Sequence, residues 1–339
     1  MNLYKKYLEN LLNKNPSLVT KSEHWVDQSV IKNHGEGVIE ISPPDRVQKE
    51  FALIFSCGIH GNETAPIEIV NDMLADIESG ILEIKNPLLI IFGNIKAMRE
   101  GTRFVENNLN RMFSGEYKKY DIDDYEPKRA KEIEESISDF FNKYKNLKKV
   151  HYDLHTAIRS SKYPKFAVYP HLREGRCYSK NQLSLFSLMG IEAVLLMHKF
   201  SPTLSYYSST THGADAFTLE LGKVEKFGEN IRSNFKDAEI VLSSLVSGKK
   251  LETSNKLPKL CQVKKELIRH EEEYDFKISD DTANFTEFEK GTVLASDSVE
   301  IYTVEDDGEM IAFPNGNVKV GQRSGLVMKA VNPKDIKVV

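Results

Sequence analysis

Residues 51–63, FALIFSCGIHGNE, join an apolar run to a turn that contains two glycines. The apolar part, residues 51–56, predicts a buried strand. Behind the turn, from about Thr64, the apolar side chains fall on one face at helical spacing: Ile67, Val70, Leu74 and Ile77. Gly80 is a typical residue at a helix end. We therefore predict a strand, a glycine-bearing turn and a helix in direct succession.

Strands and helices alternate along the chain to about residue 247. We expect further strands at residues 37–41, 88–92, 150–154, 166–169, 193–197 and 216–221, and further helices at residues 127–144, 180–189 and 227–247. Such alternation is typical of an α/β fold, here with a mostly parallel or mixed sheet flanked by helices. Active groups in these folds gather at the carboxyl ends of the strands.

The amino-acid composition changes after Gly248. Residues 249–258 are polar and linker-like, and the remainder is rich in Gly, Asp, Asn and β-branched residues with repeated turn signals. We therefore expect two domains. Residues 1–248 form an α/β domain that carries the candidate catalytic residues, and residues 249–339 form a smaller C-terminal β-rich domain.

Composition narrows the class of protein. The chain has 339 residues, a formal net charge of −4 and three widely spaced cysteines without a CxxC pair. A net negative charge argues against a nucleic-acid-binding protein. The cysteines indicate neither a disulfide framework nor a cysteine zinc site. Residues 1–13 have no apolar block of signal-peptide type, and no apolar run is long enough for a membrane span. We expect a soluble cytoplasmic protein with no membrane partner; a homo-oligomer stays open.

Three residues have the side chains of a catalytic zinc site. His60 and Glu63 lie three residues apart in the turn after the first buried strand, and His155 ends the strand at residues 150–154. Two imidazoles and one carboxylate can bind zinc and leave a position for water. The alternatives are a helix-entry turn, with Glu63 near the positive end of the helix, and a hydrogen-bonded structural histidine.

Two carboxylates could assist such a site. Glu220 lies inside the apolar strand at residues 216–221, where a charge is costly unless it is paired or functional. Beside a zinc site it could act as the general base and acid; otherwise it is a salt-bridged structural residue. Asp153 shares a strand face with His151 and His155 and could orient an imidazole, or it could be a solvated strand residue.

The loop at residues 101–113 concentrates arginine and asparagine side chains. One arginine could face a developing oxyanion, and a second arginine with a neighbouring asparagine could hold a substrate carboxylate. In isolation, a solvent-facing basic loop is the simpler interpretation. Among the other histidines, His212 is a weak second candidate because it closely precedes the strand of Glu220.

Taken in order, these segments resemble the succinylglutamate desuccinylase/aspartoacylase family, whose fold is similar to that of the zinc carboxypeptidases. The segments that carry the resemblance are residues 58–68, 93–94, 108–113, 152–159, 218–223, 284–286 and 321–326. The resemblance covers nearly the whole chain. A single HGNE motif is weak evidence, whereas the ordered set is specific.

The resemblance implies a role for each matching residue. His60, Glu63 and His155 match the zinc ligands, with one Zn²⁺ per subunit, and Glu220 matches the catalytic glutamate. Arg103 matches the arginine that polarises the scissile carbonyl. The pair that grips the amino-acid carboxylate matches Asn110 and Arg111.

The implied substrate is a small anionic N-acyl amino acid. The reaction would be hydrolysis of N-succinyl-L-glutamate in the succinyltransferase route of arginine catabolism. Alternatives are aspartoacylase-like deacylation of another N-acyl acidic amino acid, a carboxypeptidase, and a non-catalytic metal- or metabolite-binding protein on the same scaffold. For selection of the succinyl group, the candidates from charge and position are Arg159, Lys162 and Lys165.

Overall fold

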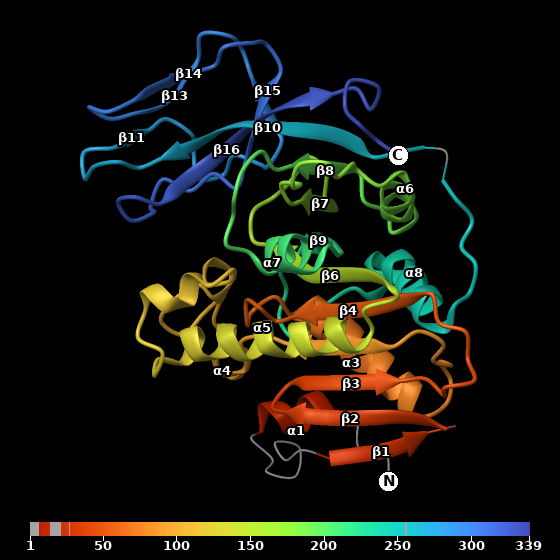
Figure 1. The fold of residues 1–339 in the computed structure, drawn as a ribbon. Helices are drawn as coiled ribbons and strands as arrows, with labels where there is room; N and C mark the ends of the chain where they lie inside the picture. The colour runs from red at the N-terminus through yellow and green to blue at the C-terminus, as the bar shows by residue number, and fades with distance from the viewer. Residues whose placement is uncertain (1–6, 14–21, 27, 255) are drawn as a thin grey trace.

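The computed structural model describes residues 7–13, 22–26, 28–254 and 256–339. Within these residues, thirteen strands form one mixed sheet. The sheet runs through the molecule from the N-terminal strands to the C-terminal ones (Figure 1). In their order across the sheet, the strands are β1 (Ser22–Val26), β2 (Ser29–Gly35), β3 (Val38–Ser42), β5 (Leu88–Phe92), β4 (Phe51–Cys57), β6 (Lys148–Ala157), β9 (Asp215–Lys223), β7 (Phe166–Tyr169), β8 (Ala193–Leu196), β10 (Lys259–Ile268), β16 (Arg323–Val331), β15 (Glu309–Ala312) and β12 (Thr286–Phe288).

The centre of the sheet is parallel. β5, β4, β6 and β9 all run in the same direction, whereas β2 and β3 pair antiparallel with their neighbours. β7 pairs antiparallel with β9 and parallel with β8. Strand β5 is buried along its whole length, and β4 is buried at every residue except Phe51. Continuous burial is expected of parallel strands that helices cover on both faces. The predicted α/β fold with a mixed sheet is confirmed.

Helices cover both faces of the sheet (Figure 1). Side chains of α1 (Tyr7–Leu12), α3 (Thr64–Glu78), α4 (Ile95–Glu100), α6 (Lys180–Leu188) and α8 (Lys236–Ser247) belong to the core on one face. Side chains of α5 (Tyr125–Lys143) and α7 (Leu204–His212) belong to the core on the other face. Three short 3₁₀ helices complete the described helices: η2 (Leu109–Arg111), η3 (Glu116–Lys119) and η4 (Arg232–Asn234).

Strand β4 shows how the sequence supplies both cores. Leu53 and Phe55 pack in the core that contains α3, and Ala52 and Ile54 pack in the core that contains α5. Successive side chains of a strand point to opposite faces of the sheet, so an uninterrupted apolar run contributes side chains to the cores on both faces. The helix predicted from Thr64 is α3, whose apolar face lies in the first of these cores.

The predicted helix at residues 227–247 is wrong in its first part. Helix α8 begins only at Lys236. Gly228 has a φ of +80°, which no right-handed helix contains. The side chain of Asn230 donates to a hydroxyl and a carboxylate on α3, and Ile231 is 65% exposed. These contacts hold the segment against the start of α3 instead of extending α8.

The chain after residue 249 is β-rich, as expected. Strand β10 pairs parallel with β8 and antiparallel with β16, so the C-terminal strands extend the large sheet. A separate small sheet has the order β11 (Asp275–Phe276), β13 (Val293–Ser296) and β14 (Ile301–Thr303). This C-terminal part lies at the top of Figure 1, beyond β7 and β8.

In the described ranges, none of the helices combines the length and the apolar character that crossing a membrane requires. Residues 1–6 of the N-terminal stretch 1–13 lie outside the described part of the chain.

Candidate metal centre and active site

The turn between β4 and α3 carries His60 and Glu63. Glu63 is the residue immediately before α3. The turn passes so close to α4 that a Cβ at Gly61 would lie 2.2 Å from the carbonyl carbon of Ala97, so only glycine fits there. The backbone N–H of Gly61 donates to the carbonyl of Arg103 at 3.1 Å. The glycine therefore brings the loop after α4 against the turn that holds the two candidate ligands.

His155 and Glu220 come from two neighbouring parallel strands. They are opposite each other in the register of β6 and β9, and β6 is flanked on its other side by β4. Parallel strands bring their carboxyl ends to one edge of the sheet, and residues in register point to the same face. The sheet thus places both side chains at the edge where the turn after β4 lies.

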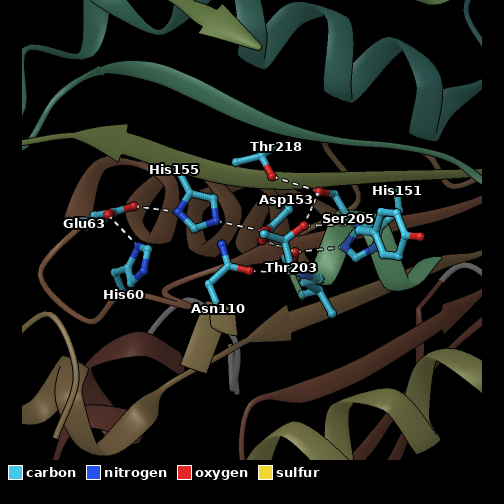
Figure 2. A network of polar contacts seen from close by, with 12 residues as sticks. His60, Glu63, Asn110, His151, Asp153, His155, Thr203, Ser205 and Thr218 are labelled. Carbon is cyan, nitrogen blue, oxygen red and sulfur yellow. Dashed lines mark hydrogen bonds and ion pairs between the residues drawn. The ribbon is translucent and has the colours of Figure 1, made fainter. Parts of the chain in front are cut away.

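His60, Glu63 and His155 converge in the structure. One potential ligand atom from each lies within 4.8 Å of the others, and all three residues are buried. Glu63 bridges the two rings, with Oε1 2.7 Å from Nδ1 of His60 and Oε2 2.8 Å from Nδ1 of His155 (Figure 2). The ring centroids are 5.1 Å apart.

Each ring uses its other nitrogen to fix its orientation. Nε2 of His60 lies 3.1 Å from the amide oxygen of Asn108, and Nε2 of His155 lies 2.8 Å from a carboxylate oxygen of Asp153. Both rings therefore turn Nδ1 toward Glu63. Nδ1 of His60 is buried and makes no hydrogen bond, although Glu63 is close to it. Two Nδ1 atoms and a carboxylate that face one point are the donor set expected of a metal site.

The buried charges of the group shift one another's pKa values. Burial raises the pKa of Glu63, but the two histidines outweigh burial and hold it well below its usual range. Burial lowers the pKa of His155, but Asp153 and Glu63 raise it well above its usual range. Burial and the guanidinium of Arg103 lower the pKa of His60 to about 4. The carboxylates around His155 thus favour a positive charge, which a proton or a metal cation can supply.

Glu220 is a buried carboxylate with a free oxygen. It is 8% exposed, and its Oε2 has no hydrogen-bond partner. Burial and the neighbouring carboxylate of Glu63 raise the pKa of Glu220 to about 7, although His155 and Arg103 oppose this. A buried acceptor without a partner is costly in a folded protein, so its retention at this edge suits a group that exchanges protons.

Two residues of the loop at 101–113 also lie at or near the group. Nη1 of Arg103 lies 2.7 Å from Oε1 of Glu63, so its guanidinium is beside the candidate ligands. Asn110 is buried, and its side-chain oxygen accepts the backbone N–H of Leu204 at 3.0 Å. That contact ties the loop to the start of α7 and leaves the amide NH₂ of Asn110 out of this bond.

Arg111 lies in a cationic region to which the C-terminal part contributes. The surrounding protein and the guanidinium groups of Arg323 and Arg103 lower the pKa of Arg111 to about 9, and Glu266 opposes this shift. Arg323 on β16 pairs with Glu266 on β10 at 3.3 Å, and Lys199 pairs with the other oxygen of Glu266 at 2.9 Å. Positive charges therefore outnumber negative ones around Arg111.

Four of the weaker candidates have contacts outside this group. His212 ends α7 and contacts Ser138 and the ring of Phe141. The guanidinium of Arg159 pairs with Asp280. The other two are Lys162, whose backbone N–H donates to the carbonyl of Asn284, and Lys165, which lines a separate pocket beside Lys223 and Asn230.

Sequence reasoning assigned no role to three side chains near the site. Asn108 orients His60, and Ser56 donates to Asp153 at 2.6 Å. His151 lies 2.9 Å from Ser56. The signals for them are the alternation His151, Asp153, His155 along one strand face and the register that places Ser56 opposite Asp153.

Proteins of known family are similar to this chain over most of its length. A family model described as the succinylglutamate desuccinylase/aspartoacylase catalytic domain matches residues 50–246, and one described as the AstE/AspA barrel-sandwich hybrid domain matches residues 258–331. A protein of Pseudoalteromonas atlantica named succinylglutamate desuccinylase is 42% identical over 320 residues, which cover 93% of this chain and 89% of the relative. One of Pseudomonas syringae pv. tomato with the same name is 40% identical over 296 residues, covering 86% and 87%.

Solved structures give the same result. The succinylglutamate desuccinylase of Vibrio cholerae superimposes with a TM-score of 0.87 at 33% identity, covering 96% of this chain and 95% of the other. That of Chromobacterium violaceum gives 0.83 at 34% identity, covering 96% and 98%. The expected resemblance is confirmed, and the chain belongs to the succinylglutamate desuccinylase/aspartoacylase family.

Proposed function

We propose that this chain hydrolyses the amide of N-succinyl-L-glutamate to succinate and L-glutamate, in the succinyltransferase route of arginine catabolism and hence in the cytoplasm. The observation that carries the proposal is the convergence of His60, Glu63 and His155 at the sheet edge that also carries the partnerless carboxylate oxygen of Glu220. The names of the relatives at 42% and 40% identity support the choice of substrate.

Zinc is the metal that we propose for His60, Glu63 and His155. Two imidazole nitrogens and one carboxylate are a known ligand set of catalytic zinc, and they leave one position for water. The fit rests on the two Nδ1 atoms that face Glu63 while each Nε2 is held by another side chain. When bound, zinc polarises a carbonyl oxygen and lowers the pKa of a water molecule to about 7.

The proposed work of the protein groups follows from their positions. Glu220 accepts a proton from the attacking water and then gives it to the nitrogen of the departing glutamate. Its pKa of about 7 lets one carboxyl group carry out both transfers near neutral pH. The guanidinium of Arg103, beside Glu63, faces the amide oxygen as negative charge develops on it.

The C-terminal part supplies a charge that suits this substrate. N-succinyl-L-glutamate carries three carboxylates, and anions of this kind need cationic partners. We propose that Asn110 and Arg111 hold the α-carboxylate of the glutamate. Arg323, on β16, adds positive charge at Arg111. On this proposal residues 1–248 carry out the chemistry, and residues 249–339 complete the anionic substrate site.

Arg103→Ala is expected to lower kcat about 10²–10³-fold, because removal of one donor to a developing oxyanion typically has this effect. Steady-state kinetics with N-succinyl-L-glutamate would measure it. Arg232→Ala is a matched control, because Arg232 pairs with Asp72 and Glu239 outside the group. An effect of Arg103→Ala on KM alone would contradict the proposed role.

Arg111→Ala is expected to raise KM more than it lowers kcat, because the α-carboxylate keeps the same charge in the ground state and in the transition state. Loss of a charged hydrogen-bonded partner corresponds to roughly 1.5–3 kcal/mol, or about 10–100-fold in KM. The same kinetic assay compares it with Arg103→Ala. The reverse pattern for the two variants would overturn both assignments.

The decisive experiment for the function is a direct comparison of substrates. The purified protein with zinc is given N-succinyl-L-glutamate, N-acetyl-L-aspartate or a long peptide, and the released amino acid is measured. We expect the highest kcat/KM with N-succinyl-L-glutamate. Higher activity on acetylaspartate would indicate an aspartoacylase, and activity on the peptide would indicate a carboxypeptidase. No hydrolysis of any of the three, with zinc bound, would favour a binding protein.

A further inference from the structure

A row of buried hydrogen bonds leads from His155 to helix α7 (Figure 2). Its successive contacts join Nε2 of His155 to Asp153 at 2.8 Å, Asp153 to Ser56 at 2.6 Å, Ser56 to Nε2 of His151 at 2.9 Å, and Nδ1 of His151 to Ser208 at 2.7 Å. All five residues are at most 1% exposed. The row thus connects β6, β4 and α7 without solvent.

The direction of each hydrogen bond follows from the number of protons available. A carboxylate at Asp153 is the form that satisfies both of its contacts, because its two oxygens lie beside the hydroxyl of Ser56 and Nε2 of His155. As an acceptor only, it must receive the hydroxyl proton of Ser56 on one oxygen and the Nε2–H of His155 on the other. Because the single hydroxyl proton of Ser56 is then used, Ser56 can only accept from Nε2–H of His151.

The far end of the row follows in the same way. Burial lowers the pKa of His151 to about 4, so its ring has one proton at neutral pH. That proton lies on Nε2, so Nδ1 accepts the hydroxyl proton of Ser208. Every donor in the row therefore points toward Asp153 from one side, and His155 points toward it from the other.

We propose that Ser208, His151 and Ser56 form a positioning chain that holds Asp153 in place for Nε2 of His155 and so keeps Nδ1 of His155 directed toward Glu63 and the metal position. None of these three residues belongs to the candidate ligand group. They act through Asp153, whose second oxygen they orient. Since the proposal concerns metal affinity, it holds whichever acyl amino acid is the substrate.

The geometry explains why such a chain is needed. Asp153 accepts hydrogen bonds from two donors, Ser56 and His155. The region is buried, so a polar group that loses its partner there lowers the stability of the protein. If Asp153 rotated, Nε2–H of His155 would lose its acceptor, and the proton could move to Nδ1, which would then repel a cation. Partners that orient a ligating histidine in this way typically change metal affinity about 10–100-fold.

The test is the affinity of each variant for zinc alone, measured by competition with a chromophoric chelator. Ser56→Ala is expected to weaken zinc binding about 10–100-fold, because it removes the donor to Asp153 and the acceptor of His151 together. Ser208→Ala is expected to have a smaller effect, because it removes only the hydrogen bond to Nδ1 of His151, which keeps the ring proton on Nε2, and leaves the contact between Ser56 and Asp153 in place. His151→Gln, whose amide can still donate to Ser56, is expected to retain more affinity than His151→Leu.

Ser205→Ala is the matched control. Ser205 lies one helical turn before Ser208 on α7, is equally buried, and has a side-chain hydrogen bond of 2.9 Å to Thr218. It is not part of the chain, so zinc affinity should stay at the level of the unaltered protein while thermal stability falls. A purely structural role for Ser56 would give Ser56→Ala and Ser205→Ala the same result, and that outcome would overturn the proposal.

A second measurement separates tautomer from folding. Nitrogen-15 NMR of histidine-labelled protein, with a cadmium or zinc ion bound, reports which ring nitrogen of His155 carries the proton. We expect the proton on Nε2 in the unaltered protein and in Ser205→Ala. In Ser56→Ala, the chemical shift of Nε2 should move toward that of a weaker hydrogen bond. An unchanged shift together with unchanged zinc affinity would refute the positioning chain.

Discussion

Glu220→Gln is expected to lower kcat about 10²–10⁴-fold, which is the usual contribution of a positioned general acid or base. Glutamine has nearly the same shape but cannot take up a proton from water. Because Glu220 does not belong to the three-ligand group, zinc affinity should change little. Kinetics and a zinc titration on the same sample distinguish loss of proton transfer from loss of metal.

The pH dependence of kcat/KM gives an independent check on Glu220. The base must be ionised, so kcat/KM should fall as the pH drops through the pKa of Glu220. That pKa is about 7 from burial and Glu63, and a bound cation would lower it. We therefore expect an acidic limb at or below about pH 7. A profile of Glu220→Gln that keeps this limb and the original kcat would exclude Glu220 as the base.

Removal of the metal is expected to lower turnover by at least about 10³-fold, with recovery when zinc is added back. Polarisation of the carbonyl and activation of water each contribute several kcal/mol, and 1.36 kcal/mol corresponds to tenfold in rate. The measurement is the rate of glutamate release before chelation, after chelation and after zinc is restored. Full activity after removal of the metal would contradict the proposal that the reaction depends on zinc.

His155→Ala should have the same effect without a chelator, because it removes one of the three proposed ligands. His212→Ala is the matched control, since His212 is a partly buried histidine that contacts Ser138 and Phe141 and not the candidate ligands. We expect zinc binding to be lost in the first variant and retained in the second. Equal zinc affinities in the two variants would show that His155 is not a ligand.

Local patterns were sufficient to predict much of the fold. The apolar run at residues 51–56 is strand β4, and the helical spacing from Thr64 is helix α3. Both signals are strong. A strand that is buried on both faces leaves an unbroken apolar run, and a helix that is buried on one face leaves apolar residues at helical spacing. The first part of the helix predicted at residues 227–247 was wrong because contacts of Asn230 with α3 outweigh the local helical pattern there.

The composition of the candidate site was also visible in the sequence. His60 and Glu63 lie in one short motif, His155 ends a strand, and Glu220 interrupts an apolar one. These positions lie in or directly after buried strands, where a polar or charged side chain is costly unless it is paired or functional. The order of the segments then indicated the family.

By itself, the sequence determined which donor atoms are available and on which elements they lie. The tertiary structure alone decided that Nδ1 of each imidazole faces Glu63, that Asp153 is joined through Ser56 to His151, and that Arg323 reaches the surroundings of Arg111. The physical reason is that a hydrogen bond depends on distance and direction between atoms far apart in the chain. Strand register and packing set both quantities, and no local pattern contains them.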